Sequence, residues 1–225
     1  MSDFWLIRHG STDTLDERIA GCAPGVHLNE RGRNEVLALA SRIGDCGAQC
    51  VYTSPLERAR ETAEPLAAAL QCPLIQQEAL GELEFGSWTN QRFDQLQGDE
   101  HWGRFNRFRS GTRLPGGDSF LSVQARAVNV LLDLRERHPN ERILIVSHGD
   151  VIKGVLMHFL GIAIDMCHRL TIAPTSISQL ELHADYVSIT RINDTSHVER
   201  PGCCTTDASD KLEAGRTAPH TPRLR

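Results

Sequence analysis

The sequence lacks an apolar run long enough to cross a bilayer, and its N-terminus has no basic segment followed by an apolar stretch. A spanning helix needs about 20 consecutive apolar residues, and a secretory signal needs a basic region before its apolar core. We therefore expect a cytoplasmic protein that does not enter a membrane. The 225 residues are 40% hydrophobic and 24% charged, as in an ordinary globular protein of one domain.

The sequence also lacks a disulfide framework, a metal-ligand cluster and an excess of positive charge. Its seven cysteines are irregularly spaced, as expected for reduced and mostly buried thiols. Cys46 and Cys50 have no second ligand pair at a distance that fits a zinc site. The net charge of −5 argues against nucleic acid as the main partner. We expect no metal and no other cofactor.

Two short apolar runs, residues 4–7 and 143–146, each lead into a histidine that is followed by glycine. Such runs are typical of buried strands in a parallel sheet. In open α/β sheets, ligands bind beyond the carboxyl ends of the strands. The sequence therefore predicts that His9 and His148 meet at one site. Arg8, beside His9, predicts that the ligand is an anion.

Strand and helix patterns alternate along the chain, which predicts a three-layer α/β/α sandwich with a mostly parallel central sheet. Further strands are expected at 50–53, 73–75, 142–147, 177–182 and 186–192, the last two as a terminal hairpin. Helices are expected after Asn29, after Ser54-Pro55 with a kink or break at Pro65, after Ser119, and after Asp150 as a cap.

The predicted domain covers residues 1–195. Within it, residues 78–117 lose clear periodicity, and about residues 88–117 are expected to form a cap or insertion beside the site. Residues 196–225 are polar and aperiodic, and we expect a flexible C-terminal tail, with a tail folded onto the site as the alternative.

Four segments carry side chains suited to phosphate chemistry. They are Leu6-Ile7-Arg8-His9-Gly10-Ser11-Thr12, Ser54-Pro55-Leu56-Glu57-Arg58-Ala59-Arg60-Glu61-Thr62-Ala63, Leu80-Gly81-Glu82-Leu83-Glu84-Phe85-Gly86-Ser87-Trp88 and Val146-Ser147-His148-Gly149. Each alone has an ordinary explanation, such as a core histidine or a loop carboxylate. Together, over about residues 4–194, they resemble the histidine phosphatase superfamily in its phosphoglycerate-mutase-like branch.

The resemblance implies a role for each matching residue. His9 corresponds to the nucleophile, and Arg8, Arg58 and His148 correspond to the phosphate pocket. Glu82 corresponds to the loop glutamate that acts as proton donor. All five count as candidate catalytic residues.

Further phosphate contacts are expected from Gly10, Thr12 and Gly149, in the loops that follow the two strands. The ligand implied is a small phosphorylated molecule, and the oligomeric state, monomer or homodimer, stays open.

The chemistry suits these residue types. A phosphate monoester dianion repels nucleophiles, and arginine forks neutralise it. His148 would assist if protonated, which a nearby phosphate favours. His9 must present an unprotonated nitrogen to phosphorus, with its other nitrogen donating to a backbone carbonyl. The expected intermediate is a phosphohistidine, and Glu82 needs a raised pKa to donate a proton near neutrality.

Recognition of the superfamily does not decide between hydrolase and mutase. The segment from Trp88 to Gly116 spans 28 positions, whereas mutases resembling the glycolytic enzyme carry a longer insertion there. Leu15 and Gly81 stand where those mutases usually have asparagine. These departures favour a metal-independent phosphomonoesterase. A phosphoglycerate mutase and a non-catalytic phospholigand-binding protein are the alternatives.

The predicted cap is rich in aromatic residues and arginines, namely Trp102, Arg104, Phe105, Arg107, Phe108, Arg109 and Arg113. They would suit a phosphorylated ligand with a ring or a second anion. The competing interpretation is a surface helix that packs Phe105 and Phe108 while its arginines stay solvated. Substrates such as α-ribazole phosphate, sugar phosphates and protein phosphohistidine are not distinguished by the sequence.

Overall fold

A six-stranded sheet forms the centre of the computed structural model, which describes residues 1–44 and 46–198. The strand order is β3-β2-β4-β1-β5-β6. The strands are β1 (Ser2–Arg8), β2 (Ala48–Thr53), β3 (Leu74–Gln76), β4 (Arg142–Ser147), β5 (Ile177–Leu182) and β6 (Val187–Asp194). The first four pair in parallel, and β5 and β6 add an antiparallel hairpin.

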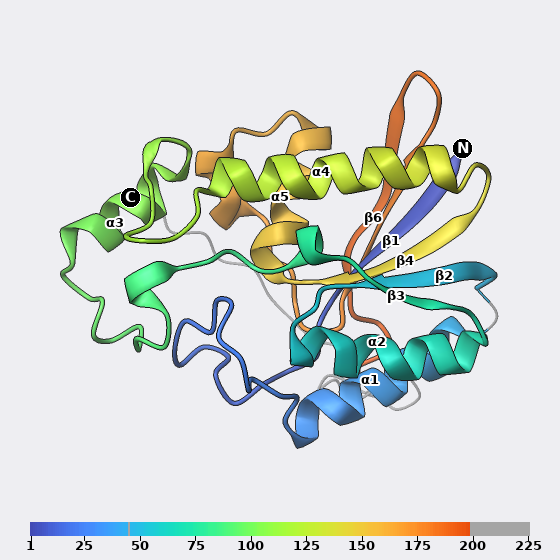
Figure 1. Cartoon of the computed structure of the whole chain (residues 1–225), viewed down its shortest axis with the longest axis horizontal. Helices are drawn as coiled ribbons and strands as arrows, with labels where there is room; N and C mark the ends of the chain where they lie inside the picture. The colour runs from blue at the N-terminus through green and yellow to red at the C-terminus, as the bar shows by residue number, and fades with distance from the viewer. Residues whose placement is uncertain (45, 199–225) are drawn as a thin grey trace, which may run out of the picture.

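Helices cover both faces of this sheet (Figure 1). Helices α1 (Glu30–Ile43) and α2 (Glu57–Leu70) bury one set of strand residues, including Ile7 and Val146. Helices α4 (Phe120–Arg137) and α5 (Gly149–Leu160) bury the alternate set, including Phe4 and Ile145. Because neighbouring strand residues point to opposite faces, each strand serves both cores. The predicted three-layer α/β/α sandwich is confirmed.

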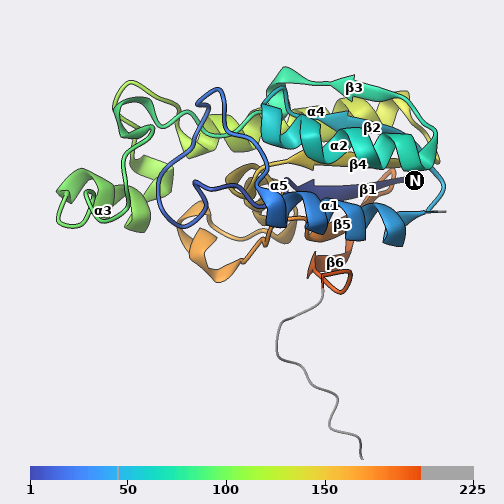
Figure 2. The ribbon, with the colours of Figure 1, turned by 90° about the horizontal axis from the view of Figure 1, so that it is seen from below.

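The segment between β3 and α4 extends from one end of the sheet (Figures 1 and 2). It consists of short turns, η1 (Glu78–Leu80), η2 (Gly86–Trp88) and η3 (Arg109–Gly111), around helix α3 (Glu100–Arg107). A further turn, η4 (Ile164–Arg169), follows α5. We refer to residues 88–117 as the cap. Within the cap, Trp88 packs edge to face against Trp102, and Phe105 packs in the same way against Phe85, which lies just before the cap.

The interpretation of the cap as a surface helix that packs Phe105 and Phe108 while its arginines stay solvated is wrong at two positions. Phe105 is buried as expected, but Phe108 is 45% exposed, whereas Arg109 is only 6% exposed. The guanidinium of Arg109 lies over the rings of Phe105 and Phe120, so this arginine belongs to the packed interior.

Predicted details of two helices, α2 and α5, are also wrong. Helix α2 begins at Glu57 rather than at Pro55, and it continues unbroken through Pro65 to Leu70, held by the buried residues on its sheet-facing side. Ser54 does not cap it but bonds His148 instead. Asp150 lies inside the first turn of α5 and pairs with Arg109, so it is not the cap.

The register of β1 and β4 positions the candidate site. Arg8 pairs with Ser147, so the next residues, His9 and His148, leave the sheet side by side. The backbone N–H of His9 still donates to the Ser147 carbonyl at 3.0 Å, and the two imidazole centroids lie 5.1 Å apart. The predicted meeting of the two histidines is therefore a direct result of parallel pairing.

Among the described residues, no helix is both long enough and apolar enough to cross a membrane. Of the expected tail, residues 196–198 are described, and His197 bonds the Thr175 hydroxyl. The expectation for the rest of the tail lies outside the described residues.

Candidate active site

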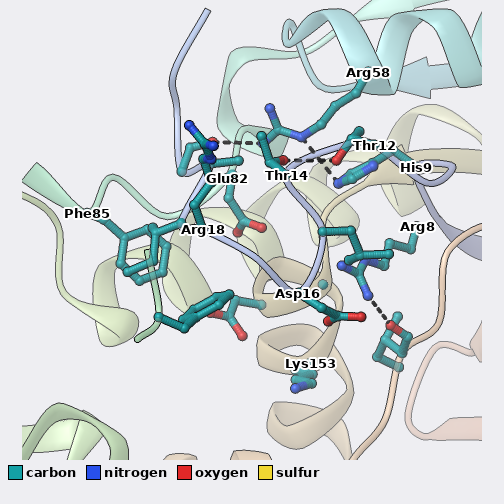
Figure 3. A pocket seen from close by; sticks show the side chains of 18 of the residues that line it. Arg8, His9, Thr12, Thr14, Asp16, Arg18, Arg58, Glu82, Phe85 and Lys153 are labelled. Carbon is teal, nitrogen blue, oxygen red and sulfur yellow. Dashed lines mark hydrogen bonds between the residues drawn. The ribbon is translucent and has the colours of Figure 1, made fainter. Parts of the chain in front are cut away.

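A cavity of about 500 Å³ opens at the carboxyl end of the sheet, between β1, α5 and the cap. Figure 3 shows Arg8, His9 and Arg58 on one side of this cavity, Phe85 on the opposite side and Glu82 between them. The cavity thus has a strongly basic end at the strands and an aromatic wall at the cap.

His9 is held in one tautomer. Its Nδ1 lies 2.8 Å from the carbonyl oxygen of Gly10, which can only accept, so Nδ1 carries the proton. The Nε–H of Arg58 donates to Nε2 of His9 at 3.2 Å. Burial lowers the pKa of His9 well below its ordinary value, and the charges of Arg58 and Arg8 lower it further. His9 is therefore neutral, with its lone pair on Nε2.

Within residues 1–44 and 46–198, Arg8 and Arg58 bring two positive charges to this end without a carboxylate in contact. Arg58 donates to the Gly21 carbonyl at 2.7 Å and to His9, and its Nη1 is buried without a partner among the described residues. Arg8 donates to the Ile172 carbonyl at 2.6 Å, and its Nε also has no partner in that part of the chain. Burial lowers the pKa of both guanidiniums. Buried, unpaired N–H groups of this kind are costly unless an anion accepts from them.

His148 is fully buried beside His9. Its Nε2 bonds the Ser54 hydroxyl at 2.7 Å, while its Nδ1 has no partner among the residues that the structure describes. Burial, with Arg58 and His9 next in order, lowers the pKa of His148 well below its ordinary value. In the free protein His148 is therefore a neutral hydrogen-bonding group, and the protonation that the sequence suggested depends on the charge of a bound phosphate.

Glu82 lies in the loop after η1, at the cavity wall. Burial and, second, the charge of Asp150 raise its pKa to about 7, although the Leu83 N–H, which donates to its Oε1 at 2.9 Å, opposes the shift. A carboxyl with this pKa is about half protonated at neutrality, so it can both donate and accept a proton there.

The three remaining predicted contacts are placed differently from one another. Thr12 and Gly149 line the cavity, and the Thr12 hydroxyl bonds that of Thr14. Gly10 is not among the residues that line it, and its N–H donates to the Thr62 hydroxyl at 3.0 Å. A Cβ at Gly10 would lie 2.9 Å from the Gly32 carbonyl oxygen, so a glycine here permits close packing of the two segments, and its phosphate contact stays a prediction.

Sequence reasoning missed Arg126, which holds the Glu82 loop in place. From α4, its guanidinium donates to the carbonyls of Ala79, Gly81 and Glu82, at 2.6 Å and 2.9 Å for the last two. It also missed Asp150 as a neighbour of the site. Arg126 stands on the inner side of an otherwise apolar helix face, and that unusual position was the available signal.

Within residues 1–44 and 46–198, no group of three histidine, cysteine, aspartate or glutamate side chains is arranged to hold a metal ion. The polar groups of the cavity are instead donors for an anion at one end and a titrating carboxyl beside it.

The chain belongs to the histidine phosphatase superfamily (branch 1), whose sequence pattern matches residues 4–195. This family, together with similar structures that include phosphatases, defines a phosphatase or phosphoryl-transferase type of enzyme.

Individual relatives carry different activities in their names. The probable phosphoglycerate mutase GpmB of Cronobacter sakazakii is 31% identical over 214 residues, which cover 89% of this chain and 97% of that protein. A phosphoserine phosphatase mutant from Entamoeba histolytica, in complex with phosphoserine, has a TM-score of 0.81 at 29% identity and covers 88% of this chain and 100% of its own. The α-ribazole phosphatase of Shigella flexneri has a TM-score of 0.77 at 26% identity, covering 86% and 96%.

The Arg126 contacts predict that Arg126→Met lowers kcat more for an alkyl phosphate than for p-nitrophenyl phosphate, because a displaced Glu82 matters most when the leaving group needs a proton. We expect a loss of about 10-fold for the alkyl ester. Steady-state kinetics on both esters measures it. Arg137→Met, at an exposed position of the same helix, is the matched control and should leave both rates unchanged. Equal losses on the two esters would contradict the positioning role of Arg126.

Proposed function

We propose that the protein is a metal-independent phosphomonoesterase that hydrolyses a small phosphorylated metabolite through a phosphohistidine on His9. The observation that carries this proposal is the neutral His9, whose Nε2 lone pair lies beside the guanidiniums of Arg8 and Arg58, each with a buried N–H that has no partner among the described residues. A phosphate group supplies the acceptors that these donors lack, and it places phosphorus next to a nucleophile whose tautomer is already fixed.

In the first step, the Nε2 lone pair of His9 attacks phosphorus and the ester P–O bond breaks. The leaving oxygen takes the bond's electron pair and receives the proton of Glu82, so that an alcohol departs. Arg8 and Arg58 stabilise the phosphoryl oxygens, and His148 adds a hydrogen bond. The enzyme then carries an N–P bond on His9 and a carboxylate at Glu82.

In the second step, the Glu82 carboxylate takes a proton from water while the water oxygen attacks phosphorus. The N–P bond breaks and its electron pair returns to Nε2, which regenerates neutral His9 and releases inorganic phosphate. Each step therefore needs the opposite protonation state of the same carboxyl, and a pKa of about 7 supplies both states.

Hydrolysis is favoured over mutase chemistry by the short cap, which leaves the cavity accessible to water. The similar structures named as phosphatases support the same choice. The names of the curated relatives support the mutase alternative. Phosphoserine and α-ribazole phosphate, named with similar structures, enter the substrate panel on that basis.

The nucleophile assignment predicts that the protein releases phosphate from p-nitrophenyl phosphate with a metal chelator present. His9→Ala should reduce this rate at least about 1,000-fold, since the covalent route is lost. His158→Ala, a change at an exposed histidine near the far end of α5, is the control. Chelator-sensitive activity, or unchanged turnover in His9→Ala, would refute the assignment.

The hydrolase assignment predicts the partition of 3-phosphoglycerate. We expect the protein to release inorganic phosphate from it faster than it forms 2-phosphoglycerate, because water reaches the phosphohistidine. Following both products in the same reaction by phosphorus NMR measures the ratio. If isomerisation is faster than hydrolysis, the mutase alternative holds instead.

The proton-donor assignment predicts that Glu82→Gln slows phosphoryl transfer most for esters with basic leaving groups, by about 100-fold or more. In the unsubstituted enzyme, kcat/KM for such esters should fall as the pH rises above about 7, because the free enzyme then loses the protonated carboxyl. A leaving-group series in both proteins checks these points. A uniform loss across the series would argue against proton donation by Glu82.

A further inference from the structure

A buried ion pair joins the cap to the helix that begins at the active site. Nη1 of Arg109, in η3, lies 3.1 Å from Oδ2 of Asp150, in the first turn of α5. Their side chains are only 7% and 18% exposed. Asp150 follows His148 by two residues and lines the same cavity as Glu82. The pair thus connects two parts of the chain at the edge of the reaction site.

The cap side of this pair is held firmly. The guanidinium carbon of Arg109 lies 4.6 Å from the Phe105 ring centre and 5.1 Å from that of Phe120. The next residue, Ser110, donates through both its N–H and its hydroxyl to the carboxylate of Asp165, each at 2.8 Å. These contacts fix the position of the Arg109 charge relative to the cavity.

The cavity side places a negative charge near the proposed proton donor. Asp150 is the acidic residue that acts most strongly on the Glu82 carboxyl, and it favours the protonated form. The other charged or titratable groups around Glu82 come from the neighbouring elements: Arg8 at the end of β1 with His9 after it, Asp16, Arg18 and Cys22 in the loop that follows, Arg58 on α2, Arg126 on α4, His148 before α5 and Lys153 on α5. Among them the cations predominate, and they favour the ionised carboxylate, so the charge of Asp150 offsets part of their effect and adds to the effect of burial on the Glu82 pKa.

We propose that the Arg109–Asp150 pair positions opposed charges that set the pH range in which Glu82 donates its proton, with Asp150 favouring and Arg109 limiting protonation. This inference rests on the proton-donor role of Glu82 proposed above. Because Arg109 belongs to the cap and Asp150 to α5, the cap must be in place for this balance to exist. Both are positioning residues, since they act through Glu82.

The test is the pH dependence of kcat/KM for 2-phenylethyl phosphate, a substrate with a poor leaving group. Asp150→Asn removes the negative charge and leaves Arg109 uncompensated, so the alkaline limb should move to lower pH by about one unit. Arg109→Met keeps an unbranched side chain against the Phe105 and Phe120 rings but removes the positive charge that compensates Asp150. The alkaline limb should therefore move to higher pH. The double variant should lie between the two single variants.

Opposite shifts are the result that a merely structural role would not produce. If both single variants lose activity with no shift, or shift in the same direction, the proposal is wrong. If Arg109→Met does not fold, the comparison of Asp150→Asn with the double variant still tests the proposal. The alkaline limb of the double variant must lie at a higher pH than that of Asp150→Asn. Asp194→Asn, which breaks the Arg42–Asp194 pair on α1 and β6, is the matched control and should leave the profile unchanged.

Glu82→Gln separates this inference from the proposed function. If the alkaline limb survives in Glu82→Gln, then Glu82 is not the titrating acid and the proposed function is at fault. If the limb disappears there but does not move in Asp150→Asn, only the ion-pair proposal is overturned. The ionisation of the substrate phosphate is common to all the variants and cancels in the comparison.

Discussion

The placement of the buried Arg58 and the partly buried Arg8 beside His9, with no contacting carboxylate among the described residues, is the constraint on which the site depends. Each guanidinium satisfies part of its donor set with a backbone carbonyl and keeps one buried N–H without a partner in the described part of the chain. Such an arrangement is unfavourable in the free protein. Together with the burial of His9 itself, it lowers the pKa of His9 and keeps its Nε2 unprotonated, and it leaves donors that an anion can satisfy. Binding and activation of the nucleophile therefore have the same physical origin.

The sheet and the helices packed against it hold the guanidiniums of Arg8 and Arg58 close together despite the repulsion between their charges. Parallel pairing of β1 with β4 brings the two histidines together. Thr62 on α2 links the two segments that carry Arg8 and Arg58. Its hydroxyl accepts from the Gly10 N–H and donates to the Arg58 carbonyl at 2.7 Å. On the other side, Arg126 fixes the loop of Glu82, and the Arg109–Asp150 pair ties the cap to α5. The proton donor and the nucleophile thus come from separate elements with separate supports.

Much of this architecture could be predicted from the sequence, because it depends on local patterns. The buried strands, the N-caps at Asn29 and Ser119 and the left-handed C-cap at Gly161 follow from residue type and periodicity. Contacts between distant segments could not be predicted in this way. Asp150 has the residue type of a helix cap, and only the fold brings it to Arg109, 41 positions away. Ser54 was likewise diverted from capping by His148, 94 positions away. For Gly10, the sequence suggested a phosphate contact, and the close approach of its backbone to Gly32 could not be predicted from the local pattern.

The central claim is that His9 reacts through Nε2, because Nδ1 is committed to the Gly10 carbonyl. The most direct measurement is phosphorus and proton NMR of the enzyme, trapped by rapid alkaline quench during turnover and digested to the peptide that carries His9. The account predicts one phosphorylated histidine, His9, with phosphorus on Nε2. Phosphorus on Nδ1 of His9, or on His148, would contradict it.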